Sequence, residues 1–147
     1  MEWQNFEEST QELPEVVLEK LIAGFSAATK DLVQLSISPL SDMEHISSKL
    51  KSRFQFNVYL TSKQLSDYSF KVFQFGYSVS LYPVSIIIST GIIQELKSQQ
   101  GLSEVTVIND EEELQQTIKL IFNTNKFKEI VGGLMKIARQ RRDTFQY

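Results

Sequence analysis

The chain has 147 residues, of which 41% are hydrophobic and 22% are charged, and its formal net charge is −3. This length and composition are typical of one globular domain, and they exclude a disordered chain, which combines low hydrophobicity with high net charge. The chain has no cysteine, which excludes disulfides and thiolate metal sites and favours the cytoplasm as the compartment.

The first twelve residues are polar and acidic apart from Trp3 and Phe6, and they lack the basic and apolar parts of a secretory signal. The sequence leaves open whether they form a flexible arm or a short helix. Pro14 suits the first turn of a helix, where its missing N–H has no partner to lose. The helical spacing of the apolar residues that follow predicts a helix over residues 14–29.

Apolar and polar residues alternate over residues 31–39 and again over residues 56–61, which predicts two half-buried strands. Between these strands, Ser41 and Glu44 have the spacing of a capping box and predict a short helix. Its apolar residues share one helical face, which we expect to be buried: Met43, Ile46 and Leu50.

Residues 68–79 are rich in aromatic and β-branched side chains and predict a third strand. The alternation changes phase within this strand, because its apolar residues occupy even positions up to residue 72 and odd positions from residue 73. A β-bulge near residues 72–73, or burial of both faces, would explain the change. Gly76 is the alternative place for the distortion.

Residues 81–88 are nearly all apolar and predict a central strand, with Pro83 at its start or beside an unpaired edge. The longest apolar run, around residues 84–88, is far too short to span a bilayer, so we expect no membrane partner. Ser89 or Thr90 can cap the helix that follows, and residues 104–108 predict a fifth strand.

Two helices close the chain. Asn109 is the expected N-cap of the first, whose acidic first turn matches the helix dipole, and Thr124 or Asn125 is the expected N-cap of the second. The last helix has the clearest amphipathic stripe in the chain, which consists of Phe127, Ile130, Val131, Leu134, Ile137 and Ala138.

Gly132 and Gly133 lie inside this last helical pattern, where each costs roughly 1 kcal/mol relative to Ala. We expect close packing against another element to offset this cost. A kink, or a groove for a partner helix, is the alternative.

These elements predict a single α+β domain over residues 1–147, with about five strands and about five helices. Three consecutive strands with short links indicate an antiparallel meander, which we expect to form part of a mixed sheet. Helices cover one face of that sheet or both.

No catalytic centre is apparent. The chain has no Cys, no serine in a G-x-S-x-G turn and a single histidine, His45, which is typical of a surface position beside Asp42 and Glu44. The acidic residues 110–113 are consecutive on a helix and point in different directions, so they do not converge on a metal. We therefore predict no catalytic residue, no metal site and no cofactor.

The segment Ser89-Thr90-Gly91 joins a buried strand to a helix, a place where anions can meet helix N–H groups. It lacks the glycines and lysine of a phosphate-binding loop, so a plain helix cap is the favoured interpretation.

Two groups of residues are candidates for an interaction surface. Tyrosines on exposed sheet faces suit protein interfaces, and a basic helix end can contact phosphate. The candidate residues are Tyr59, Tyr77, Tyr82, Arg139, Arg141 and Arg142.

The preferred hypothesis is a non-enzymatic domain that binds another protein, such as an inhibitor, an immunity- or antitoxin-like neutraliser or an adaptor. One alternative is a nucleic-acid-associated accessory protein that uses the basic C-terminal helix. The other is a small ligand-binding or enzymatic domain with a site near Ser89 and Gly91.

Overall fold

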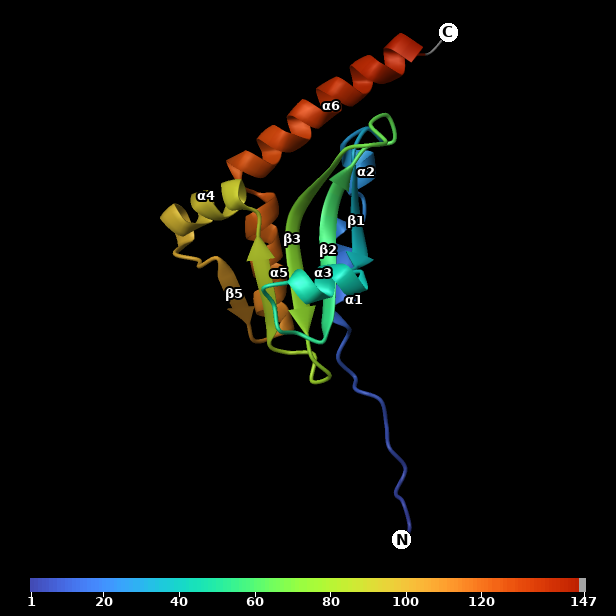
Figure 1. Ribbon diagram of the computed structural model, residues 1–147, viewed down its shortest axis with the longest axis vertical. Helices are drawn as coiled ribbons and strands as arrows, with labels where there is room; N and C mark the ends of the chain where they lie inside the picture. Colours follow the sequence, from blue (N-terminus) through green and yellow to red (C-terminus); the bar gives the residue numbers. More distant parts are fainter. Residues whose placement is uncertain (146–147) are drawn as a thin grey trace.

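A single five-stranded sheet forms the centre of the protein (Figure 1). The computed structural model describes residues 1–145, except for the side chains of residues 100 and 145. The strands lie in the sheet in chain order, and each pairs antiparallel with its neighbours: β1 (Gln34–Pro39), β2 (Phe54–Thr61), β3 (Ser69–Tyr77), β4 (Val84–Ile88) and β5 (Val105–Ile108). The predicted α+β class and the five strands are confirmed.

The sheet is antiparallel throughout the described residues and is not the mixed sheet that we expected. A helix between two adjacent strands usually connects parallel strands. Here α4 (Thr90–Gln100) lies at the end of the sheet where β4 finishes, and the chain enters β5 from that same end. The meander therefore continues through the helix.

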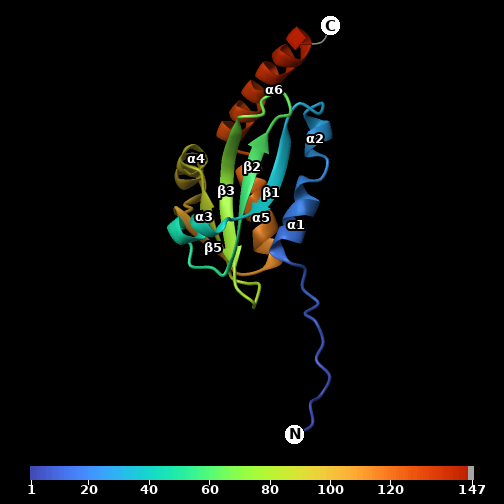
Figure 2. The same ribbon diagram turned by 45° about the vertical axis from the view of Figure 1, so that its right-hand side comes forward.

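The helices divide between the faces and one end of the sheet (Figures 1 and 2). On one face, α1 (Pro14–Ile22) packs against α5 (Glu111–Phe122), and the short α3 (Asp42–Ser47) lies over the other face. Beyond one end of the sheet, α6 (Asn125–Phe145) runs obliquely from α4. Among the helices of residues 1–145, none has the length and apolar character needed to cross a membrane.

The core lies between the sheet and the pair α1 and α5. Paired residues of neighbouring strands point to the same face, and Phe73 with Ile88 and Phe75 with Ile86 are pairs that point into this core. The largest fully buried side chains are Leu18, Leu60, Phe73, Phe75, Ile86, Ile92, Leu96, Ile108, Ile118 and Ile121.

The phase change in β3 is a β-bulge at Val72. Val58 pairs with Phe73 but the next residue of β2, Tyr59, pairs with Lys71, so Val72 has no partner on β2. The bulge is thus where the sequence predicts it. Gly76 keeps regular pairing and serves close approach instead, because a Cβ there would lie 2.7 Å from the Cβ of Ser52.

The helix predicted over residues 14–29 is interrupted. Gly24 has φ of 87°, which ends α1 and lets the chain begin the four-residue α2 (Phe25–Ala28). Lys30 and Asp31 then adopt φ of 56° and 61°, so the chain is extended only from about Leu32 and β1 begins at Gln34. Residues 1–13 form neither helix nor strand and extend away from the end of the sheet opposite α6 (Figures 1 and 2).

The short helix α3 has the predicted capping box, but its expected buried face is wrong. Met43 and Ile46 are 81% and 86% exposed, and only Leu50 of that set is buried. The helix instead directs Glu44 toward the sheet, where Asn57 Nδ2 donates to Glu44 Oε2 at 2.8 Å. Because the sheet face beneath α3 is polar, the helix packs on it through its polar side and leaves Met43 and Ile46 exposed.

The two C-terminal helices follow the prediction with two exceptions. Thr124 caps α6 as predicted, since Phe127 N–H donates to its hydroxyl at 3.2 Å, whereas α5 is capped by Asp110 and not by Asn109. The expected close packing of Gly132 and Gly133 is wrong, because a Cβ on either residue would meet nothing within 4 Å.

Candidate functional site

The outer face of the sheet, opposite α1 and α5, carries a closed polar network. Gln74 Nε2 donates to Ser48 Oγ at 2.7 Å and to Gln55 Oε1 at 2.9 Å. Gln55 in turn donates to the carbonyls of Leu50 and Ser52. These amides hold the segment that follows α3 onto the sheet, so much of this face is not a free surface.

A hollow of about 470 Å³ does lie at the predicted strand–helix junction, and Ser89 and Thr90 line it together with Glu44, Lys71 and Glu104. Its carboxylates are committed to partners. The hydrogen bond from the Ser41 backbone N–H is the largest of the effects that lower the pKa of Glu44, and Glu104 pairs with Lys49 at 3.1 Å. A general acid requires a raised pKa, so the lowered pKa of Glu44 does not suit that role.

Two buried polar atoms near this face have no hydrogen-bond partner among the described residues, Ser89 Oγ and Asn57 Oδ1. His45 is half-buried on α3 and is not among the residues that line the hollow. Within residues 1–145, no three His, Asp or Glu side chains gather closely enough to hold a metal ion.

The three candidate tyrosines do not share a surface. Tyr59 lies on the outer face, where its hydroxyl accepts from Asn57 Nδ2 at 3.1 Å. Tyr77 is 5% exposed on the opposite, helix-covered face, and its ring stacks on Phe56. Lys71 pairs with Tyr59 and lines the hollow on the outer face. In a regular strand Tyr77, six residues later, would lie on that same face, but the bulge at Val72 reverses the alternation.

Tyr82 lies in the turn between β3 and β4, at the same end of the sheet as Tyr77, and is half-buried. Burial raises its pKa to about 12, and the negative charges of Glu111, Asp110 and Glu12 act in the same direction. Its hydroxyl is buried and has no hydrogen-bond partner in the part of the chain that the structure describes.

The candidate arginines lie on two sides of α6. Arg141 borders a groove between α6 and the β2–β3 turn, whereas Arg139 and Arg142 border a groove on the other side of the helix. The adjacent glycines divide in the same way, with Gly133 in the first groove and Gly132 in the second. The open space beside each glycine thus belongs to a groove.

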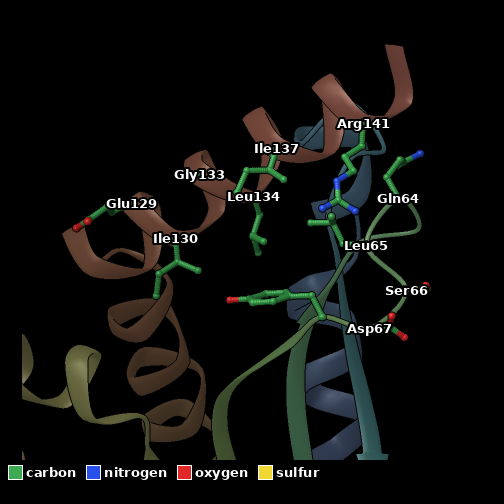
Figure 3. Close-up of a pocket in the computed structure, with 11 residues that line it drawn as sticks. Gln64, Leu65, Ser66, Asp67, Glu129, Ile130, Gly133, Leu134, Ile137 and Arg141 are labelled. Atoms are coloured by element: carbon green, nitrogen blue, oxygen red, sulfur yellow. The ribbon is translucent and has the colours of Figure 1, made fainter. Parts of the chain in front are cut away.

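The first groove, which we call the apolar groove, has a volume of about 620 Å³. Figure 3 shows Ile130, Leu134 and Ile137 on the side of α6 that lines the groove, with Arg141 beside Leu65. Leu134 is buried, but Ile137 and Tyr68 are 49% and 41% exposed. The residues that line this groove are Gln64, Leu65, Ser66, Asp67, Tyr68, Glu129, Ile130, Gly133, Leu134, Ile137 and Arg141.

The second groove, which we call the basic groove, has a volume of about 600 Å³. Leu32, which is 2% exposed, and the half-buried Met135 give it an apolar floor. Its four cationic residues are Lys30, Lys136, Arg139 and Arg142. Two acids are near them in the chain: Asp31 follows Lys30, and Asp143 lies 3.8 Å from Arg142.

Sequence reasoning identified one wall of each groove and missed the other. The stripe on α6 and the arginines were visible as a helical pattern. Leu65 and Lys30 lie in turns, where the available signals were a single apolar residue in a polar loop and a single cation. Neither signal specifies which part of the chain will lie opposite.

Comparison of the chain with models of protein families, with characterised proteins and with solved structures finds no significant match in any of the three. The function must therefore be argued from the two grooves themselves.

Proposed function

We propose that this protein is a non-enzymatic binding domain whose target is another protein, and that the target docks in the apolar groove. The observation that carries the proposal is an open groove in which a buried leucine, a half-exposed isoleucine and a glycine lie side by side on α6. Inhibitors, immunity- or antitoxin-like neutralisers and adaptors all act by such docking. A cysteine-free chain suits a reducing compartment, so we place this binding in the cytoplasm.

The chemistry of the groove favours an amphipathic helix as the bound element. Ile130, Leu134 and Ile137 repeat at helical spacing and form one apolar wall, and Leu65 and Tyr68 form the other. A helix lies in such a groove through its own residues at positions i, i+3, i+4 and i+7. Gly133 has no side chain to hold the partner backbone away from α6.

The rim of the groove is polar, as the rims of protein interfaces are. Asp67 and Glu129 supply negative charge and Arg141 supplies positive charge. These three groups are exposed enough to select a partner by charge while the apolar floor supplies most of the affinity.

The alternative hypotheses have weaker support. The carboxylates in the hollow at Ser89 are paired or hydrogen-bonded, which does not favour an enzymatic site there. A nucleic-acid site would have to use the basic groove alone, on a chain whose formal net charge is −3.

The test fills one groove at a time. Gly133→Leu adds a side chain to the apolar groove, and Gly132→Leu is the matched control, since it makes the same change one residue away in the basic groove. Neither change disturbs packing at Cβ, and both favour helix. Tagged wild type and variants are used to capture proteins from cells that produce this chain, and mass spectrometry quantifies what each retains.

We expect one or more proteins to be retained by the wild type and by Gly132→Leu, and to be depleted by roughly tenfold or more on Gly133→Leu, because filling the groove forfeits the central contacts. Ile137→Glu should give the same loss. Identical retention by the wild type and Gly133→Leu would show that the apolar groove is not the docking site.

A further inference from the structure

An acidic arm with two aromatic side chains leaves the end of the domain opposite α6 (Figures 1 and 2). Residues 1–11, which we call the acidic arm, are all exposed and contain Glu2, Glu7 and Glu8 but no Lys or Arg. Trp3 and Phe6 are each 73% exposed, and their rings lie 6.2 Å apart. They form a compact aromatic pair that the domain itself does not cover.

The basic groove has the complementary chemistry. Its floor of Leu32 and Met135 can pack on aromatic rings, and thioether–aromatic contacts are favourable. Its cationic rim can pair with the arm carboxylates, and Arg139 or Arg142 can stack on an indole face. The arm therefore carries aromatic side chains for the apolar floor and carboxylates for the cationic rim.

The directions of arm and groove favour a second copy as the source of the arm. The arm extends away from the sheet at one end, and α6 lies beyond the other end (Figures 1 and 2). To reach the groove of its own domain the arm would have to turn back along the sheet, whereas the arm of a second copy would not. We propose that the acidic arm of one copy binds the basic groove of another, through Trp3 and Phe6 on the groove floor and the arm glutamates on its cations.

This contact is heterologous, because an arm meets a groove and not a second arm. Each copy retains a free arm or a free groove after one contact, so association continues head to tail unless the rotation between copies closes a ring. The inference does not depend on the proposed function, which uses the other side of α6.

Trp3 is the only tryptophan in the chain and therefore reports on the arm alone. In the full chain we expect the Trp emission to shift to shorter wavelength as protein concentration rises, together with an increase in mass by sedimentation velocity. Both changes should be reversed at about 0.5 M salt, where charge pairs are screened within a few ångströms.

Variants of the full chain test the two halves of the contact. Lys136→Glu/Arg139→Glu in the groove should weaken self-association by roughly tenfold or more, as reversal of paired charges does. Lys51→Glu/Arg53→Glu is the matched control, because it makes the same change in net charge at exposed positions that belong neither to residues 1–11 nor to the lining of the basic groove. This control should associate as the wild type does.

Mixing two defective copies gives the decisive result. Trp3→Ser/Phe6→Ser has an intact groove and no tryptophan, and Lys136→Glu/Arg139→Glu has an intact arm. Each alone should remain monomeric, and an equimolar mixture should form a 1:1 dimer whose emission is shifted to shorter wavelength.

Three results would overturn the proposal: monomers with unshifted emission at every concentration, a shifted emission in a chain that stays monomeric, and a mixture that does not associate. The second would place the arm on its own domain. Saturable binding of a fluorescent oligonucleotide that the groove variant loses and the Trp3→Ser/Phe6→Ser variant retains, in a chain that stays monomeric, would assign the groove to nucleic acid.

Discussion

The hydroxyl of Tyr77 donates a hydrogen bond of 2.5 Å to Glu15 Oε1, which joins the end of β3 to the first turn of α1. The two residues are 62 positions apart in the chain. Burial, together with the hydrogen bond and the negative charge of Glu15, raises the pKa of Tyr77 well above its usual range. The neutral phenol is therefore part of what holds α1 on the sheet.

Replacing this phenol should weaken the domain. Tyr77→Phe retains the ring stacked on Phe56 and removes the hydrogen bond to a charged group, so we expect the free energy of unfolding to fall by about 1.5–3 kcal/mol. Chemical denaturation at pH 7 measures the change. An unchanged midpoint would mean that Glu15 gains as much from water as from Tyr77.

The same residue gives a pH dependence with a definite sign. Because the pKa values of Tyr77 and Tyr82 are raised in the folded state, the unfolded chain loses these protons first as pH rises. Stability from both groups is complete below about pH 10, the ordinary pKa of tyrosine, and declines above it. Denaturation midpoints measured from pH 8 to pH 11 should show this decline, and Tyr77→Phe should make it shallower.

Two residues of the α6 stripe should differ in their effect on stability. Leu134→Ala removes a side chain that is 5% exposed and should cost about 2–5 kcal/mol. Ile137→Ala removes one that is 49% exposed and should cost less than half as much. Equal costs would show that α6 is more deeply buried in solution.

Replacing the two unconstrained glycines of α6 should change stability in the opposite direction to replacing the constrained Gly24 and Gly76. Gly132→Ala and Gly133→Ala should each raise the free energy of unfolding by about 0.5–1 kcal/mol, because a Cβ there meets open space. Gly24→Ala and Gly76→Ala should lower it, the first because φ is 87° and the second because of the 2.7 Å approach to Ser52. Thermal unfolding of the four variants checks both signs.

The three arginines should be dispensable for folding. Arg139 and Arg141 are exposed and Arg142 is half-buried, so replacement of each by Ala should change the free energy of unfolding by under about 0.5 kcal/mol. A larger loss in the Arg142 variant alone would show that its stem packs in the basic groove. Denaturation of the single variants separates these outcomes.

Features fixed by local sequence were predictable. Alternation located β1 and β2, aromatic and β-branched content located β3, and an apolar run located β4. The phase change in β3 located the bulge at Val72. The capping box at Ser41 and the cap at Thr124 also follow from short-range hydrogen bonds. In each case the residues that decide the structure lie within a few positions of one another.

Features that join distant segments were not predictable. The apolar groove brings residues 64–68 beside residues 129–141, and no pattern in either segment predicts that the two lie together. The burial of Tyr77 depends on a bulge that the sequence placed, but the sequence did not show which face the helices would cover. The exposure of Ile46 likewise depends on the polarity of the sheet face beneath α3.

The order of the strands has a consequence for how this chain folds. Every strand pairs only with strands adjacent to it in sequence, so each pairing joins segments that are close in the chain and little chain entropy is lost before contacts form. The packing of α1 on α5 is different, since it brings residues 14–22 to residues 111–122. We expect hairpins of the meander to form early and the docking of α1 to come last, with the bond between Tyr77 and Glu15 forming in that final step.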